Sequence, residues 1–145
     1  MYKHILIPTD GSPLAEDAIK HGLMLAKALN AKVTVLTVTP PFHVLAVEPM
    51  MVTDTREQYD KDVAAMAERR LTFAREAAKV AGVVYEDAHL VAEHPWAAII
   101  DTAKARGCDL IFMASHGRKG VSALVLGSET TKVLTHSKIP TLVCR

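Results

Sequence analysis

Short hydrophobic runs alternate with segments of helical periodicity along this chain of 145 residues. Runs that are almost continuously apolar, and rich in Val, Ile and Leu, are typical of strands that are buried on both faces of a parallel sheet. We expect five such strands, at residues 5–8, 32–38, 83–91, 108–113 and 140–144. Glu86 and Asp87 interrupt the third run, which places that strand at an edge of the sheet.

Helices are expected between these strands. Ser12 and Pro13 predict the start of the first one, because a hydroxyl caps free backbone N–H groups and proline suits the first helical position. The apolar stripe of this helix consists of Ala15, Ile19, Gly22, Leu23, Ala26 and Leu29. Further helices are predicted at about residues 63–81, from Pro95 towards Gly107, and from Ser128 to His136. Residues 42–55 show no clean period, so we expect a long connection there.

The alternation of strands and helices predicts an α/β fold. Right-handed crossovers give a doubly wound, five-stranded parallel sheet in the order 3-2-1-4-5, with helices on both faces, in one domain that covers residues 1–145. In such a Rossmann-like fold the ligand binds beyond the carboxyl ends of the strands, where the strand order reverses.

Composition narrows the class of protein. The formal net charge is +1, so the chain lacks the broad basic field that binds nucleic acid, and we expect no such partner. No apolar run approaches the roughly 20 residues of a membrane helix, and no signal segment precedes the first strand. Cys108 and Cys144 are the only cysteines, which excludes a disulfide framework. We therefore expect a cytoplasmic protein with no membrane partner.

Polar and glycine-rich segments follow three of the predicted strands. They are residues 9–11, residues 38–39 and residues 114–120. The first and third flank the switch point, so we expect Asp10 to face the glycine-rich loop. Its carboxylate could bind ribose hydroxyls or, through water, a Mg²⁺ ion on phosphates, although no residue is predicted to ligate a metal directly. The backbone of Val38 could pair with the edge of a base.

A phosphate site is predicted where Gly127 and Ser128 begin the last helix. Free N–H groups and the positive end of the helix dipole attract anions there, and glycine lets a ligand approach the backbone closely. Simpler explanations stay open for each residue. Gly117 and Gly120 could only form a turn, Ser128 could be an ordinary cap, and Asp10 could be a turn residue before Gly11.

Histidine and cysteine give no separate chemistry. No two histidines have a metal-binding spacing, and His116 is the only one in the predicted cleft, where it could contact a phosphate or lie in solvent. We expect His4, His21, His89 and His136 at the surface or at its boundary. Both cysteines are expected to behave as small hydrophobic residues without a depressed pKa.

Both ends of the chain resemble the universal stress protein family. Residues 5–12, Ile-Leu-Ile-Pro-Thr-Asp-Gly-Ser, resemble its opening strand, and the chain closes on Ile-Pro-Thr-Leu-Val, as family members do. The nucleotide loop of the family, Gly-x2-Gly-x9-Gly-Ser/Thr, reads here Ala114-x2-Gly117-x9-Gly127-Ser128. The resemblance implies a Rossmann-like fold of the adenine-nucleotide α-hydrolase type, with ATP or AMP as ligand. It also implies a homodimer that forms through the last strand, residues 140–144.

The resemblance assigns nucleotide contacts residue by residue. They are Pro8, Thr9, Asp10, Val38, Ala114, Ser115, His116, Gly117, Gly127, Ser128, Glu129 and Thr130. Two positions depart from the family pattern. Ala114 replaces the first motif glycine, and we expect that this position needs small size rather than a left-handed backbone. Glu93 stands where members usually carry glycine two residues before Pro95, and we expect that segment on the opposite side from the phosphates.

Three functions follow from this combination of features. The first is an adenine-nucleotide sensor with little or no catalysis, which would regulate a protein partner. It is favoured because the sequence has a phosphate site but no Gly-Lys-Ser/Thr triplet and no other evident attacking group. The second is a slow, Mg²⁺-dependent ATPase that uses Asp10. The third is an interaction protein that has lost the nucleotide, for which Ala114 is the only support.

Overall fold

Five parallel strands form one sheet in the computed structural model, which describes residues 1–42, 56–117 and 126–145. The strands are β1 (His4–Pro8), β2 (Lys32–Thr39), β3 (Tyr85–Val91), β4 (Leu110–Ala114) and β5 (Thr141–Cys144). Their order is β3-β2-β1-β4-β5, which confirms the predicted doubly wound topology. Most of the predicted connection at residues 42–55, and residues 118–120 of the glycine-rich loop, lie outside the described residues.

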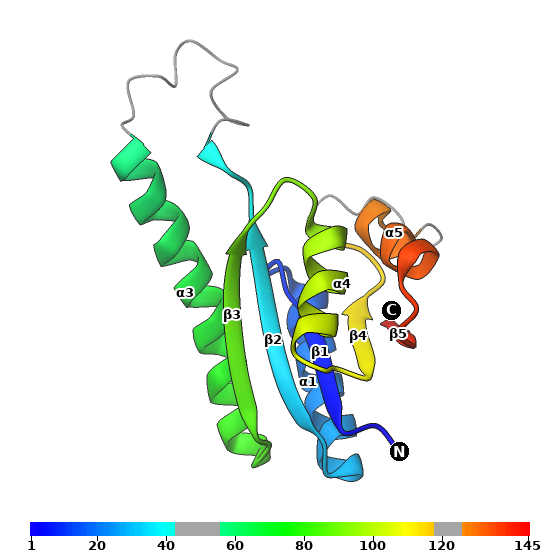
Figure 1. Cartoon of the computed structure of the whole chain (residues 1–145). Helices are drawn as coiled ribbons and strands as arrows, with labels where there is room; N and C mark the ends of the chain where they lie inside the picture. The colour runs from blue at the N-terminus through cyan, green and yellow to red at the C-terminus, as the bar shows by residue number, and fades with distance from the viewer. Residues whose placement is uncertain (43–55, 118–125) are drawn as a thin grey trace.

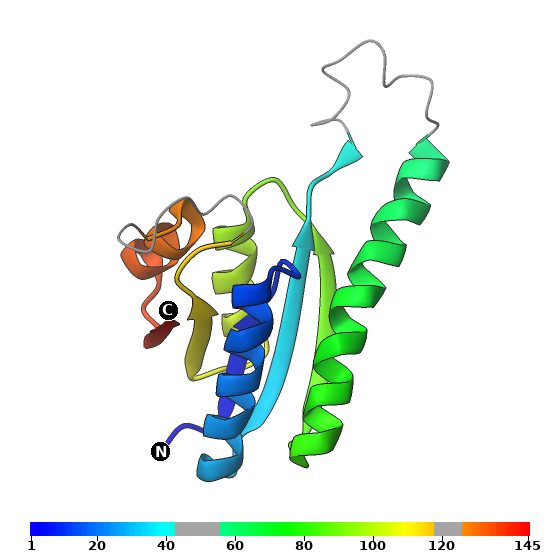
Figure 2. The same ribbon diagram turned by 180° about the vertical axis from the view of Figure 1, so that it is seen from behind.

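Helices cover both faces of the sheet, as predicted. They are α1 (Pro13–Leu29), α3 (Arg56–Ala81), α4 (Pro95–Ala105) and α5 (Ser128–His136). Figure 1 shows α4 and α5 in front of the sheet, and Figure 2 shows α1 and α3 on the opposite face. Helix α3 begins at Arg56, earlier than its apolar stripe predicts. Within the described ranges, no helix has both the length and the apolar character to cross a membrane.

Local sequence signals explain where α1 begins and ends. The Ser12 hydroxyl accepts a hydrogen bond from the Ala15 N–H at 3.2 Å, and Pro13 occupies the first turn. Asn30 ends the helix in the left-handed region at φ 54°, where its N–H bonds to carbonyls of the last turn. The start of α1 is therefore fixed directly after β1, beside the expected ligand.

The sheet separates two hydrophobic clusters, because successive side chains of a strand point to opposite faces. Ile5 and Ile7 of β1 pack with α1 and α3, whereas Leu6 packs on the other face with residues of α4 and α5. The same alternation in β2 sends Val33 and Val35 to the first cluster and Leu36 to the second. Along β2, odd-numbered side chains therefore face α1 and α3, and even-numbered side chains face α4 and α5.

Strand β3 lies at an edge, as predicted, but the predicted interruption at its two acidic residues is wrong. The strand is continuous because both carboxylates find partners outside it. Glu86 accepts a hydrogen bond from the Thr34 hydroxyl at 2.7 Å and pairs with Arg106 at 3.2 Å. Asp87 pairs with Arg75 of α3 at 3.1 Å. Side chains of neighbouring elements therefore pair with the two carboxylates, and the acidic residues do not interrupt the strand.

Burial shifts the pKa values of two titratable side chains. The surface position expected for His4 is wrong: its side chain is buried, and Nε2 lies 2.7 Å from the Thr34 hydroxyl. Burial accordingly lowers the pKa of His4 below its ordinary value. Burial raises the pKa of the Cys108 thiol to about 11, in agreement with an inert, hydrophobic cysteine.

Candidate functional site

A cavity of about 440 Å³ opens at the carboxyl ends of β1, β2 and β4. It brings together every predicted site residue except Ser115, and it adds five residues that the sequence did not indicate. The lining consists of Pro8, Thr9, Asp10, Ala15, Leu36, Val38, Pro95, Ile99, Met113, Ala114, His116, Gly117, Gly127, Ser128, Glu129 and Thr130. The position agrees with the switch-point rule, since β1 and β4 are neighbours with crossovers on opposite sides.

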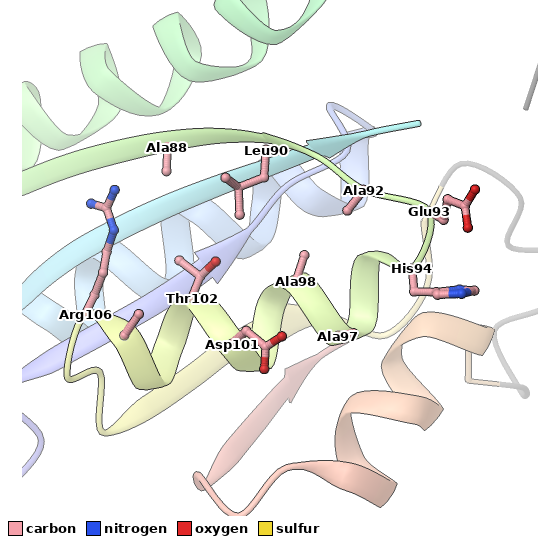
Figure 3. Close-up of a pocket in the computed structure, with 11 residues that line it drawn as sticks. Ala88, Leu90, Ala92, Glu93, His94, Ala97, Ala98, Asp101, Thr102 and Arg106 are labelled. Carbon is pink, nitrogen blue, oxygen red and sulfur yellow. The ribbon is translucent and has the colours of Figure 1, made fainter. Parts of the chain in front are cut away.

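A second cavity, of about 580 Å³, lies between β3 and α4 (Figure 3). Five of the eleven residues that line it are alanines. Its charged and polar side chains are spread along its length, with Glu93 and His94 at one end, Asp101 on the middle of α4 and Arg106 at the other end. Binding sites for small molecules combine an apolar wall with polar groups that converge on one point. The smaller cavity fits that description better, and we take it as the candidate site.

A tight turn after β1 supplies the first polar wall. The Thr9 hydroxyl accepts a hydrogen bond from the Gly11 N–H at 3.2 Å, and the Asp10 carboxylate accepts one from the Ser12 N–H at 2.9 Å. Gly11 has φ 75°, a conformation that L side chains rarely adopt. These bonds hold Asp10 at the cavity. The bond from the Ser12 N–H also makes Asp10 a turn residue, which is the simpler explanation that the sequence offered for it.

The glycine-rich loop lies directly against Asp10, as predicted. A Cβ atom on Gly117 would stand 2.3 Å from Oδ2 of Asp10, which is far inside van der Waals contact. A side chain at this position would therefore force the Asp10 carboxylate to move. The backbone of residue 117 and this carboxylate are in direct contact, and both residues line the cavity.

Hydrogen bonds close the loop between β4 and α5. The Gly127 N–H donates to the Ser115 carbonyl at 2.8 Å, and the Ser115 N–H donates to the Cys144 carbonyl at 2.7 Å. A Cβ atom on Gly127 would stand 2.9 Å from the Cα atom of His116, so the two backbone segments meet without room for a side chain. Ser115 thus supports the loop through its backbone and does not line the cavity.

The buried hydroxyl of Thr130 fastens α5 to the end of β4. It donates to the Ala114 carbonyl at 2.9 Å, which leaves the backbone N–H of this residue, rather than its hydroxyl, available for an anion. Ala114 itself belongs to β4 and has a negative φ. The alanine in place of the motif glycine consequently carries no left-handed strain, and small size is sufficient there.

The N-terminus of α5 lies at the cavity. The first bond within the helix runs from the Thr131 N–H to the Gly127 carbonyl at 3.0 Å, so the preceding N–H groups at 128–130 have no partner within the helix. Ser128 and Thr130 both line the cavity. Such a helix start, with its positive dipole end, is suited to hold phosphate.

Apolar side chains form the other half of the cavity. Leu36 and Val38 come from β2, Pro95 and Ile99 from α4, and Met113 from β4. The expectation that the Pro95 segment lies on the opposite side from the phosphates is wrong. The Trp96 N–H donates to the Glu129 carboxylate at 2.8 Å, which joins the start of α4 to the start of α5.

The backbone of Val38 faces the cavity because β1 is shorter than β2. Strand β1 ends at Pro8, opposite Leu36, and the last bond between them runs from the Thr9 N–H to the Leu36 carbonyl at 2.8 Å. Carbonyl directions alternate along a strand, so the Val38 carbonyl and N–H point the same way as the Leu36 carbonyl. At Val38, however, no β1 residue lies opposite, and a donor and an acceptor stand side by side at the cavity.

No group of three metal-binding side chains occurs among the residues whose positions are described. His116 is near the polar end, and its Nδ1 lies 3.1 Å from the Ser115 hydroxyl.

Comparisons with known proteins identify the family of the chain. The model of the universal stress protein family matches residues 1–145. The chain belongs to the universal stress protein family. Among its solved relatives, the hypothetical protein MJ0577 of Methanocaldococcus jannaschii is 30% identical, with a TM-score of 0.80 over 99% of this chain and 95% of that one.

Two other universal stress proteins share the fold at lower identity and were solved with nucleotides. One is a complex with cAMP, which is 23% identical with a TM-score of 0.71 over 99% of this chain and 97% of that one. The other, from Archaeoglobus fulgidus, is a complex with dAMP, which is 19% identical with a TM-score of 0.72 over 99% and 98%. Some members of the family therefore bind adenine nucleotides.

Two neighbouring threonines test how α5 is held. Thr130→Val removes the buried bond to the Ala114 carbonyl and should lower the free energy of unfolding by about 1–3 kcal/mol, because a buried acceptor loses its donor. Thr131→Val removes only an exposed bond to the Gly127 carbonyl and should change stability by less than about 0.5 kcal/mol. Urea unfolding of both variants measures the difference. Equal losses would contradict the anchoring role of Thr130.

Proposed function

We propose that this universal stress protein binds an adenine nucleotide, ATP or AMP, in the cavity that Asp10 and Gly117 line, and acts as a sensor or regulator with little or no catalysis. One observation carries the proposal: a single cavity is lined both by apolar side chains and by glycine backbone with a helix N-terminus. Such a division matches a molecule with a flat aromatic base at one end and phosphate at the other.

At the polar end, the proposed contacts are mainly backbone N–H groups. Gly127, Ser128 and Thr130 would hold phosphate oxygens at the start of α5, and Gly117 would approach them from the loop. Asp10 and Thr9 would bind the ribose hydroxyls. A Mg²⁺ ion, where ATP brings one, would be held by phosphate oxygens and reach Asp10 through water.

At the apolar end, the proposed base is adenine. The side-by-side N–H and carbonyl of Val38 need a partner with one acceptor and one donor. Adenine offers this pair on its N7 and N6 edge, whereas N7 and O6 of guanine are both acceptors. A guanine in the same pose would leave the Val38 carbonyl without a donor. The relatives that were solved with cAMP and dAMP support the same choice of base.

Weak catalysis is proposed because the cavity holds few groups that could act on a phosphate. Asp10 already accepts the Ser12 N–H, and the Glu129 carboxylate accepts the Trp96 N–H. The unpaired cysteines, Cys108 and Cys144, and the ordinary charge balance favour action in the cytoplasm.

The proposal predicts a preference among nucleotides. AMP should bind more tightly than GMP by about tenfold or more, because guanine leaves a desolvated carbonyl unpaired. Titration calorimetry with the purified protein measures both affinities. Equal affinity for the two nucleotides would contradict the role of Val38, and no binding of either at millimolar concentration would favour an interaction protein that has lost the nucleotide.

A pair of glycine variants supplies the control for this titration. Gly127→Ala places a methyl group against the His116 backbone and should weaken AMP binding, since the loop must move. Gly107→Ala meets no atom within 4 Å but is strained at φ +68°, so it should cost about 1 kcal/mol of stability and leave binding unchanged.

Many turnovers of ATP per second by the wild type would contradict the sensor and support the ATPase.

We also propose that two copies pair through β5. This strand lies at the edge of the sheet, and β4 is its only partner among the described strands. The Pro140 carbonyl bonds to Ile111 of β4, and the Cys144 carbonyl bonds to Ser115 directly after β4. By alternation, the N–H and carbonyl groups of Thr141 and Val143 point outward. A free edge of this kind can pair with its own copy around a two-fold axis.

A proline substitution tests the dimer without breaking the sheet. Val143→Pro removes one outward N–H and leaves the bonds to β4, because prolines are tolerated where the N–H faces outward at an edge. We expect a dimer for the wild type and a monomer for this variant by sedimentation at micromolar concentration. Val143→Ala keeps the N–H and should remain dimeric. A monomeric wild type would contradict the proposal.

A further inference from the structure

Arg70 of α3 reaches toward the site from the face of the sheet that lies opposite the cavity. Its Nη1 donates to the Thr37 hydroxyl at 3.1 Å, and Nη2 lies 3.3 Å from the sulfur of Met66 one turn earlier. Thr37 stands between Leu36 and Val38, whose side chains line the cavity, so its own side chain points to the α1 and α3 face. Neither Arg70 nor Thr37 lines the cavity.

The hydroxyl of Thr37 links Arg70 to the Thr9 carbonyl. It is fully buried and donates to the Thr9 carbonyl at 2.9 Å. A hydroxyl has a single proton, and a guanidinium can only donate. Arg70 therefore occupies a lone pair of the hydroxyl and directs the proton of Thr37 to Thr9. A donated bond from a charged group also strengthens the bond that the hydroxyl makes in turn.

The Thr9 carbonyl belongs to the peptide group that joins Thr9 to Asp10. This peptide is trans, so its C=O and N–H point in opposite directions. The Thr37 hydroxyl holds the carbonyl toward the α3 face, which directs the N–H of Asp10 toward the face that holds the cavity.

We propose that Arg70 is a positioning residue for the nucleotide, which acts through the Thr37 hydroxyl to fix the Thr9–Asp10 peptide at the cavity. The inference rests on the proposed nucleotide binding. The same bonds could instead serve only to attach α3 to the sheet. In that case their removal would change the stability of the protein and not its affinity for a ligand.

A double-mutant cycle separates the two roles. Arg70→Met keeps the length of the side chain without its donors, and Thr37→Val keeps the shape without the hydroxyl. Each should weaken AMP binding by about two- to tenfold, the worth of one hydrogen bond. Since both act through one chain of bonds, the double variant should bind no more weakly than Thr37→Val. Calorimetric titration gives the affinities, and urea unfolding of the same samples gives the stabilities.

Matched variants control for helix and strand effects. Arg75→Met removes an arginine of the same helix that pairs with Glu68 and Asp87 at 3.1 Å each, and it should leave AMP affinity unchanged. Thr37→Ser keeps the hydroxyl and should bind AMP nearly as well as the wild type. Wild-type affinity in Arg70→Met and Thr37→Val would overturn the inference, and so would an equal loss in Arg75→Met.

Amide hydrogen exchange in the ligand-free protein keeps this inference separate from the proposed function. Arg70→Met and Thr37→Val should both speed exchange at the Asp10 and Gly11 N–H groups, whereas Arg75→Met should not. If the wild type bound no adenine nucleotide, the proposed function would fail. Faster exchange would then still support the link from Arg70 to the peptide, and unchanged exchange would overturn it.

Discussion

The early end of β1 is the constraint on which the site depends. β1 stops pairing at Pro8, while β2 continues to Thr39 along β3. This difference in length leaves the Val38 backbone without a partner in β1 and frees the Thr9 carbonyl for the Thr37 hydroxyl. It also allows the chain to turn sharply into α1 at Gly11. A β1 that extended two residues further would fill the cavity with ordinary sheet.

Close backbone contacts complete the cavity from the side of β4. Gly117 lies against the Asp10 carboxylate, and Gly127 lies against the backbone of His116. These contacts bring the loop, the end of β1 and the start of α5 within reach of a single small molecule. The phosphate and base ends of the cavity therefore depend on main-chain geometry more than on special side chains. This explains why the family pattern consists of glycines and small hydroxyl residues.

The sequence predicts the strand order and most of the polar wall, because both follow from local signals and from the rules of parallel sheets. It does not predict Ile99 and Met113 in the cavity, since their apolar runs look the same whether they face a ligand or the core. Its errors at Glu86 and His4 have one cause. Both residues are satisfied by Thr34, which is far away in sequence, and such partners cannot be found from local pattern.

Amide NMR during a titration with AMP tests directly whether the nucleotide binds in the cavity that Asp10 and Gly117 line or in the cavity between β3 and α4. We expect the largest chemical shift changes at Asp10, Gly11, Val38, Gly117 and residues 127–130. The amides of Ala88, Leu90 and Asp101, which line the other cavity, should stay in place. Shifts confined to this second group, or none at saturating AMP, would contradict the assignment of the site.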